Sequence, residues 1–158
     1  MDLILDELAA SIPDPRQAIR VVIRLLAALL VGAIIGYQRE RAGKAAGLRT
    51  HMLVSMGTAM FVLAATEYGM QQDAVSRVVQ GLVTGIGFLG AGAILKVESE
   101  RMIRGLTTAA GIWMTAALGV AIGLGLLGTA VVGVFFAWIV LAILIGLERR
   151  IERSNDRP

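Results

Sequence analysis

The chain has 158 residues, of which 56% are hydrophobic and 17% are charged. A soluble domain of this size has too much surface to cover with so few polar side chains, so we expect an integral membrane protein without a soluble domain. The absence of cysteine excludes disulfides, thiolate zinc sites and iron–sulfur clusters, and the net charge of +3 is informative only through its distribution.

Apolar segments long enough to cross a bilayer recur along the chain. A transmembrane helix needs about 20 mostly apolar residues. The stretch from Leu106 to Leu147 has no charged residue and is twice that length, so we expect two helices there, joined at a glycine cluster. The expected spans are residues 19–36, 50–69, 75–95, 106–123 and 128–147. The sequence therefore predicts an all-α integral membrane protein, with one membrane domain over residues 1–158 built as a bundle of five transmembrane helices.

Lys and Arg residues gather on one side of such a bundle. With five spans, that side collects eleven of the 15 basic residues. They are Arg39, Arg41, Lys44, Arg49, Lys96, Arg101, Arg104, Arg149, Arg150, Arg153 and Arg157. Because short cytoplasmic loops carry an excess of Lys and Arg, we expect the N-terminus outside and the C-terminus in the cytoplasm.

Glycines at helical spacing are frequent within the spans. Gly32 and Gly36 form one small-xxx-small pair, Gly81 and Gly85 form another, and Gly92 lies on the same helical face as the second pair. Small residues let neighbouring backbones approach, which favours helix association in lipid. We therefore predict that all five are helix-packing positions and that the third span is the most tightly packed and central one.

Charged residues on the outer side form a first candidate site. Arg24 lies about one turn inside the outer boundary, where an arginine that faces protein is costly unless paired, although it could also snorkel to water. Asp73 and Arg77 are one helical turn apart on the same side. We predict a functional polar cluster of Arg24, Asp73 and Arg77, with helix capping as the alternative role of Asp73. Glu67 and Asp73 could ligate a metal at the outer mouth, but we expect neither a resident metal nor a cofactor.

A second candidate site lies on the inner side. Arg39, Glu40 and Arg41 end the first span, and Arg49 and Thr50 open the second. A solvated basic loop that sets topology explains part of this charge. Arg49 is followed at once by an apolar run, so it could instead bind the carboxylate of Glu40 in a bidentate way. Both interpretations stay open. The predicted inner polar cluster consists of Arg39, Glu40, Arg49, Thr50 and Arg104.

Three further features have ordinary interpretations. His51 is expected to be a hydrogen-bonded packing residue rather than a ligand. Thr107 and Thr108 open the fourth span, where helix capping is favoured over a substrate contact. Trp113 is another packing position, too deep for an interfacial belt, so its indole N–H should find an acceptor inside the bundle. With no nucleophile–base pair and no paired intramembrane carboxylates in the sequence, we expect no catalytic residues and no enzyme.

Long motifs in the chain resemble the MgtC/SapB family of bacterial inner-membrane proteins. They are Gly47-Leu48-Arg49-Thr50-His51-Met52-Leu53-Val54, then Gly81 with Gly85–Gly92, and finally Arg104–Trp113. The resemblance extends from about Gly32 to Gly125. Members of the family look like five-span proteins, and many carry an extra C-terminal cytoplasmic domain. This chain stops eleven residues after Leu147, so it resembles the short form without that domain.

The resemblance implies a multi-pass protein of the bacterial inner membrane with a link to magnesium. The family is associated with growth in low magnesium and with intracellular survival of pathogens, and some members modulate the membrane sector of ATP synthase. Two functions compete: a regulator that acts on another membrane complex through helix contacts, and a transporter for Mg²⁺ or another small solute. The scarcity of intramembrane acids favours the first, because Mg²⁺ usually takes one or two carboxylates. The expected partners are the lipid bilayer, a second copy of the chain in a homodimer and a membrane protein such as ATP synthase, but not nucleic acid.

Overall fold

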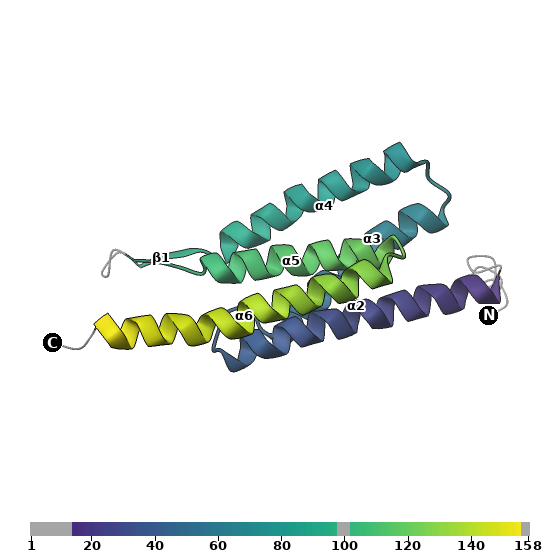
Figure 1. The fold of residues 1–158 in the computed structure, drawn as a ribbon. Coiled ribbons are helices and arrows are strands. Elements are labelled where there is room, and N and C mark those ends of the chain that lie inside the picture. Colours follow the sequence, from purple (N-terminus) through teal and green to yellow (C-terminus); the bar gives the residue numbers. More distant parts are fainter. Residues whose placement is uncertain (1–13, 98–101, 156–158) are drawn as a thin grey trace, which may run out of the picture.

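The computed structural model describes residues 14–97 and 102–155, with side chains for 14–94 and 104–142. Most of these residues lie in helices. The helices are α2 (Pro15–Arg41), α3 (Leu48–Glu67), α4 (Gln72–Gly92), α5 (Leu106–Gly123) and α6 (Leu127–Asn155). The start of α2 and the end of α6 lie at opposite ends of the bundle (Figure 1). The predicted helical bundle of five helices is confirmed for the described residues.

Four of these helices, α2 to α5, are each long and apolar enough to cross a membrane. The apolar part of α6 with described side chains, Leu127–Ala142, is shorter than these four. A multi-pass membrane protein fits this arrangement, because helices satisfy their own backbone hydrogen bonds in lipid.

Capping groups determine where α2 begins and ends. The Asp14 side chain accepts a hydrogen bond from the backbone N–H of Arg16 (2.9 Å), and Pro15 occupies the first helical position. The helix continues beyond the apolar segment to Arg41, and Gly43, with φ of +66°, follows its end. Helix α2 is therefore longer at both ends than the expected span 19–36, because hydropathy marks the lipid boundary and not the caps.

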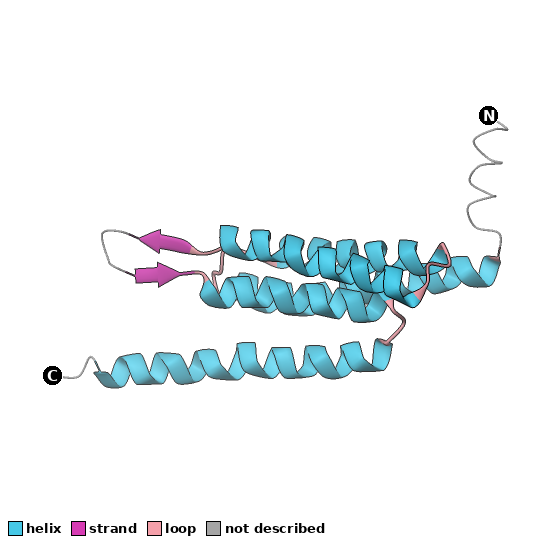
Figure 2. Cartoon of the chain, turned by 90° about the horizontal axis from the view of Figure 1, so that it is seen from above, coloured by secondary structure: helices cyan, strands magenta, loops and turns pink. Residues whose placement is uncertain are grey.

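A short β-hairpin connects α4 to α5. Strand β1 (Leu95–Val97) pairs antiparallel with β2 (Met102–Arg104), as Figure 2 shows. Gly105 is the N-cap residue of α5 and has a φ of +95°. An added Cβ at Gly105 would collide with the carbonyl oxygen of Ala93. The hydropathy pattern predicts neither strand, so the fold departs from all-α at this connection.

Helices α2, α3 and α5 form the centre of the bundle, and α6 packs beside α2 and α5. In α5, 50% of the apolar segment is buried inside the bundle, whereas in α4 only 11% of the apolar segment is buried. The principal core cluster consists of Ala28, Val31, Ile35, Ala59, Leu118, Ile122, Ala130 and Ala137. Helix α4 lies obliquely along one side of the bundle (Figure 1). The prediction that the third span is central is therefore wrong, and the central place belongs to α5.

Candidate functional site

Six buried polar side chains lie where α2, α3 and α5 meet. They are Arg39, His51, Ser55, Thr58, Thr108 and Thr115. Arg39 belongs to the last turn of α2, and Thr108 to the first turn of α5. Polar groups buried in a membrane bundle are expensive and mark candidate sites. We call these six residues the central polar cluster.

Arg39 is the charged member of this cluster. Its side chain is 1% exposed, and its Nη2 donates a hydrogen bond to Thr108 Oγ1 (3.0 Å). Its Nε is buried and makes no hydrogen bond within the described part of the chain. Thr108 therefore connects α5 to a buried guanidinium. The capping role expected for Thr108 is wrong, because the N-cap position of α5 is Gly105.

The orientation of the His51 ring follows from its hydrogen bonds. His51 Nδ1 lies 2.7 Å from Thr115 Oγ1, and that hydroxyl donates its own hydrogen to the carbonyl oxygen of Gly111 (2.8 Å). Since the hydroxyl has one hydrogen, Nδ1 must carry the proton that joins it to Thr115. His51 Nε2 and Ser55 Oγ are buried without a partner among the described residues. The ring is thus fixed by a packing hydrogen bond, while its second nitrogen remains available.

Close backbone contacts at glycines bring these side chains together. A Cβ on Gly32 would lie 2.6 Å from the carbonyl oxygen of His51, and one on Gly36 would lie 2.7 Å from the Cα of Leu48. A Cβ on Gly119 would overlap Thr58 Oγ1 and the carbonyl oxygen of Ser55. At these three positions, the approach of α2 and α5 to α3 therefore requires glycine.

The three glycines predicted on the third span lie in a different environment. Gly81, Gly85 and Gly92 are exposed, and a Cβ on any of them would have no neighbour within 4 Å. Trp113 is 49% exposed and faces α4, where it lines a small pocket with Leu82 and Ile86. The predicted packing positions therefore divide: Gly32 and Gly36 pack inside this chain, whereas the α4 glycines and Trp113 are exposed.

The outer cluster does not form as predicted. Arg24 Nη1 donates to the carbonyl oxygen of Gly123 at the end of α5 (3.0 Å). Asp73 instead pairs with Arg77 (3.2 Å), and both side chains are about two-thirds exposed. Arg24 needs no carboxylate because the C-terminal carbonyls of α5 carry partial negative charge. Asp73 lies in the first turn of α4 and is not its N-cap residue, which is Gln71.

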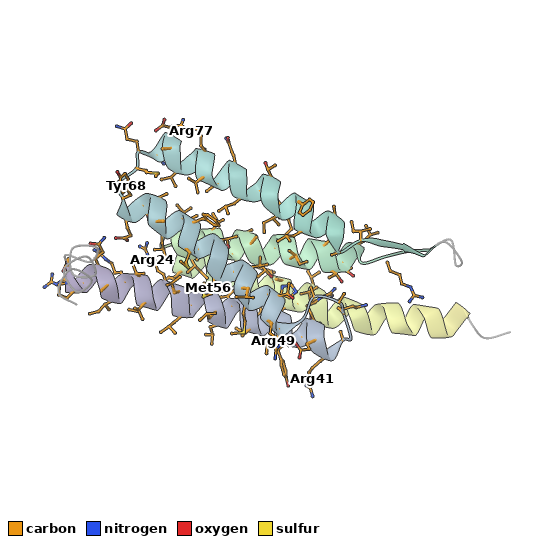
Figure 3. All side chains as sticks on the ribbon, turned by 180° about the vertical axis from the view of Figure 1, so that it is seen from behind. Arg24, Arg41, Arg49, Met56, Tyr68 and Arg77 are labelled. Atoms are coloured by element: carbon orange, nitrogen blue, oxygen red, sulfur yellow. The ribbon has the colours of Figure 1, made fainter. Side chains whose placement is uncertain are left out.

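Glu67 joins two helices at the same end of the bundle as Arg24. Its Oε2 accepts a hydrogen bond from Gln17 Nε2, which connects α3 to α2. Among the described residues, no group of three or more His, Asp or Glu side chains is placed to hold a metal ion. Arg24, Tyr68 and Arg77 are seen toward one end of the bundle in Figure 3, and Arg41 and Arg49 toward the other.

The inner cluster is divided between buried and exposed residues. Glu40 Oε2 accepts a hydrogen bond from the backbone N–H of Leu48 (2.7 Å), so it caps α3 and does not serve Arg49. Arg49, Thr50 and Arg104 are exposed. Of the five predicted inner residues, Arg39 is the one that reaches the central polar cluster.

A model of the MgtC family matches residues 25–150. The chain belongs to the MgtC family. It is 46% identical over 137 residues to Protein SrpB of Synechococcus elongatus, covering 80% of this chain and 75% of that protein. The chain is 41% identical to the putative magnesium transporter YhiD of Escherichia coli, and the match covers 85% of this chain and 65% of that protein. It is 39% identical to Protein MgtC of Salmonella typhimurium, and the match covers 87% of this chain and 56% of that protein. The chain thus spans less than two thirds of the last two relatives. No solved structure matches it.

Sequence reasoning missed several members of the central polar cluster. Ser55 and Thr115 were not predicted, although each follows a residue of the same contact at a spacing of four: Ser55 follows the cluster residue His51, and Thr115 follows Gly111, whose carbonyl oxygen accepts the Thr115 hydrogen bond. This spacing places each pair on one helical face. A hydroxyl at that spacing inside an apolar span is the signal that could have identified them.

Proposed function

We propose that this protein serves magnesium homeostasis as a regulator, acting on another membrane protein through helix contacts. In this proposal the protein crosses the bacterial inner membrane five times, with its N-terminus outside and its C-terminus in the cytoplasm. The basic residues at the α2–α3 connection support this orientation. Membership of a family with a relative named as a putative magnesium transporter supports the link to magnesium.

The observation that carries the regulatory role is the chemistry of the central polar cluster. Its groups are a guanidinium, an imidazole and hydroxyls, contributed by Arg39, His51 and four Ser and Thr residues. Mg²⁺ is bound through carboxylates and water, and it dehydrates reluctantly. A buried arginine repels a divalent cation in a low-dielectric interior. The bundle centre is thus unsuited to conducting Mg²⁺, and the magnesium link is better explained by action on a partner.

Helix α4 offers the surface for such a contact. Its exposed face carries Gly81, Gly85 and Gly92, where a neighbouring backbone could approach closely. Between α3 and α4, an apolar groove of about 640 Å³ is lined by Gly57, Gly81 and Gly85 among others. A transmembrane helix of a second copy, or of a partner such as the membrane sector of ATP synthase, fits this chemistry.

Transport measurements in liposomes test this proposal. Purified protein is reconstituted around a Mg²⁺-sensitive dye, and influx is compared with empty liposomes and with an external chelator. We expect the same rate with and without protein, while the same chain supports growth of its host in low magnesium. Chelator-sensitive influx that requires the protein would establish transport and overturn the regulatory role.

The contact itself is tested by cross-linking in the native membrane. A photoreactive residue at position 85, on the exposed face of α4, should capture a second copy or another membrane protein. The matched control is position 26 on α2, where Leu26 is 59% exposed without belonging to the glycine face. Equal capture from both positions would contradict a specific role for α4.

A further inference from the structure

A long groove runs between α3 and α4. Its deeper part is the apolar cavity of about 640 Å³, and a second cavity of about 370 Å³ adjoins it toward the start of α3. Val54 and Leu89 line both cavities. Protein interiors are close-packed, and ligand sites have volumes of about 300–1,000 Å³. The groove is therefore of a size that a bound molecule occupies.

The deeper part of the groove has apolar walls that are open to the bilayer. Leu53 and Phe61 of α3 line it and are 62% and 63% exposed, and Leu89 of α4 is 49% exposed. Gly57 lines it as well, and a Cβ at this position would have no neighbour within 4 Å. In a membrane, such a surface gains contacts either from another helix or from acyl chains, because lipid tails are as apolar as leucine.

Basic and polar residues lie at the other end of the groove. Thr50 and Ala45 line the second cavity, and both are exposed. Lys44 precedes Ala45, and Arg49 precedes Thr50 in the first turn of α3; both cations are exposed. Arg49 also lies one helical turn before Leu53. The groove thus joins an apolar part to a cationic end, at the end of the bundle where Figure 3 shows Arg49.

We propose that this groove binds an anionic phospholipid, with one acyl chain between α3 and α4 and the phosphate beside Lys44, Arg49 and Thr50. A phospholipid has the same order of parts as the groove, because its apolar chain ends at a charged headgroup. Arginine binds phosphate through charge-assisted hydrogen bonds, and the threonine hydroxyl is a further donor. Basic residues next to a bilayer attract anionic headgroups.

The same charges disfavour a helix as the occupant of the groove. A second copy packed there in the same orientation would bring its own Lys44 and Arg49 beside the first pair, and like charges repel. The proposed cytoplasmic end of another membrane helix also tends to carry Lys and Arg. The nearby carboxylate of Glu40 already accepts the hydrogen bond from the backbone N–H of Leu48. An anionic headgroup is thus the better match for this end.

The lipid site goes beyond the proposed regulatory role and does not depend on it. A partner helix contacts the exposed face of α4, whereas the lipid lies in the groove between α4 and α3. A chain that fails to act on magnesium homeostasis could still bind the lipid, and a chain that binds no lipid could still contact a partner. Lipid binding and partner cross-linking are measured separately, so the two proposals can fail separately.

Native mass spectrometry of the delipidated full chain in a neutral detergent tests the site. Phosphatidylglycerol and phosphatidylcholine with the same acyl chains are added in equal amounts, and the lipids bound to each chain are counted. We expect one tightly bound phosphatidylglycerol per chain. Its preference over phosphatidylcholine should be about 25-fold, which is about fivefold for each of the two nearby cations.

Two glycine variants locate the acyl chain. Gly57→Leu places a side chain in the groove and has room for it, so the protein should unfold at a midpoint no lower than that of the parent and yet lose the bound lipid. Gly128→Leu is the matched control. Gly128 is exposed on α6, a Cβ there would also meet nothing within 4 Å, and it lines neither cavity of the groove. This variant should keep the lipid.

Two arginine variants locate the headgroup. Arg49→Gln should lower the preference for phosphatidylglycerol about fivefold, and combining it with Lys44→Gln should abolish the preference. Arg41→Gln is the matched control and should keep the preference. Arg41 is exposed at the same end of the bundle, but it lies over the Tyr37 ring of α2, 5.3 Å from the ring centroid.

Four outcomes would overturn the proposal. Equal binding of the two lipids to the parent chain would mean that no headgroup is recognised. Lipid retained in Gly57→Leu would place the acyl chain elsewhere. A preference lowered equally in Arg41→Gln and Arg49→Gln would reduce the effect to a general attraction between charges. A dimer that Gly57→Leu disrupts, with no lipid bound to the parent, would assign the groove to a second copy.

Discussion

Two sets of glycines with the same spacing behave differently in this bundle. Gly32 and Gly36 on α2 are buried, and a Cβ on each would strike the backbone of α3. Gly81 and Gly85 on α4 are exposed, and a Cβ on either would meet nothing within 4 Å. The small-xxx-small pattern thus identifies faces that permit close approach, but it does not say whether the neighbour belongs to the same chain.

The physical reason is that lipid provides little hydrophobic drive between helices. Helices associate in a bilayer through close packing and interhelical hydrogen bonds. Around α5, both are present: the glycines bring backbones together, and the hydroxyls of Thr108 and Thr115 bond to Arg39 and His51. Among the described residues, a Cβ on any of the α4 glycines Gly81, Gly85 and Gly92 would meet nothing within 4 Å, so their face has room for a different molecule.

The largest loss of stability should come from a larger side chain in place of a buried glycine. In Gly119→Leu, the side chain would overlap Thr58 Oγ1 and the carbonyl oxygen of Ser55, and neither α3 nor α5 can yield without breaking the core. We expect a loss of about 3 kcal/mol or more, the upper end for overpacking, measured as unfolding in detergent. A variant as stable as the parent would show that α5 does not pack on α3 as described.

The next largest loss of stability is expected at the polar contact between α5 and α2. Thr108→Val keeps the shape of the side chain but leaves Arg39 Nη2 without its acceptor, so we expect a loss of about 1–3 kcal/mol. The matched control is Thr107→Val at the neighbouring exposed position, which should change stability by less than about 0.5 kcal/mol. Equal effects of the two substitutions would mean that Arg39 does not depend on Thr108.

Arg24 provides an intermediate effect at the other end of the bundle. Arg24→Gln removes a charged donor from the carbonyl oxygen of Gly123, so we expect a loss of about 1.5 kcal/mol in detergent unfolding. Arg20→Gln, at an exposed position one turn earlier on α2, serves as the control and should be nearly neutral. A neutral Arg24→Gln would leave Arg24 as a side chain that snorkels to water.

The exposed glycines should show a smaller effect on stability and a separate effect on assembly. Gly85→Leu has room for its side chain, so we expect unfolding of the monomer to change by less than about 0.5 kcal/mol. Cross-linking of α4 to its partner should fall because the larger side chain blocks the approach of another backbone. Loss of monomer stability in Gly85→Leu would show that α4 packs against its own chain.

The sequence predicted the helices well because their signal is local. Uncharged stretches and basic loops mark each span, and α5 illustrates this with a charge-free run between Arg104 and the glycine turn. Side-chain partners depend on which helices become neighbours, and that is not local. The sequence predicts that Arg24 pairs with Asp73 because both lie on the same side of the membrane, whereas packing brings Arg24 to the end of α5. The sequence predicts Arg39 in a charged cluster near a loop, and only the fold shows that Arg39 is buried.

The smallest expected effect is that of Asp73→Asn, which tests how separate α4 is from the centre. Asp73 pairs with Arg77 across one helical turn, and both side chains are about two-thirds exposed. Exposed pairs at this spacing contribute about 0.3–0.5 kcal/mol, because water competes for both charges. A double-mutant cycle between Asp73 and Arg77 should therefore give a coupling energy of that size, which decreases as salt is added.

The same cycle between Asp73 and Arg24 should give no coupling energy, since Arg24 bonds to α5 instead. A coupling above about 1 kcal/mol between Asp73 and Arg24 would tie α4 to α2 through charge, and it would remove the distinction between a central bundle and a helix left free for a partner.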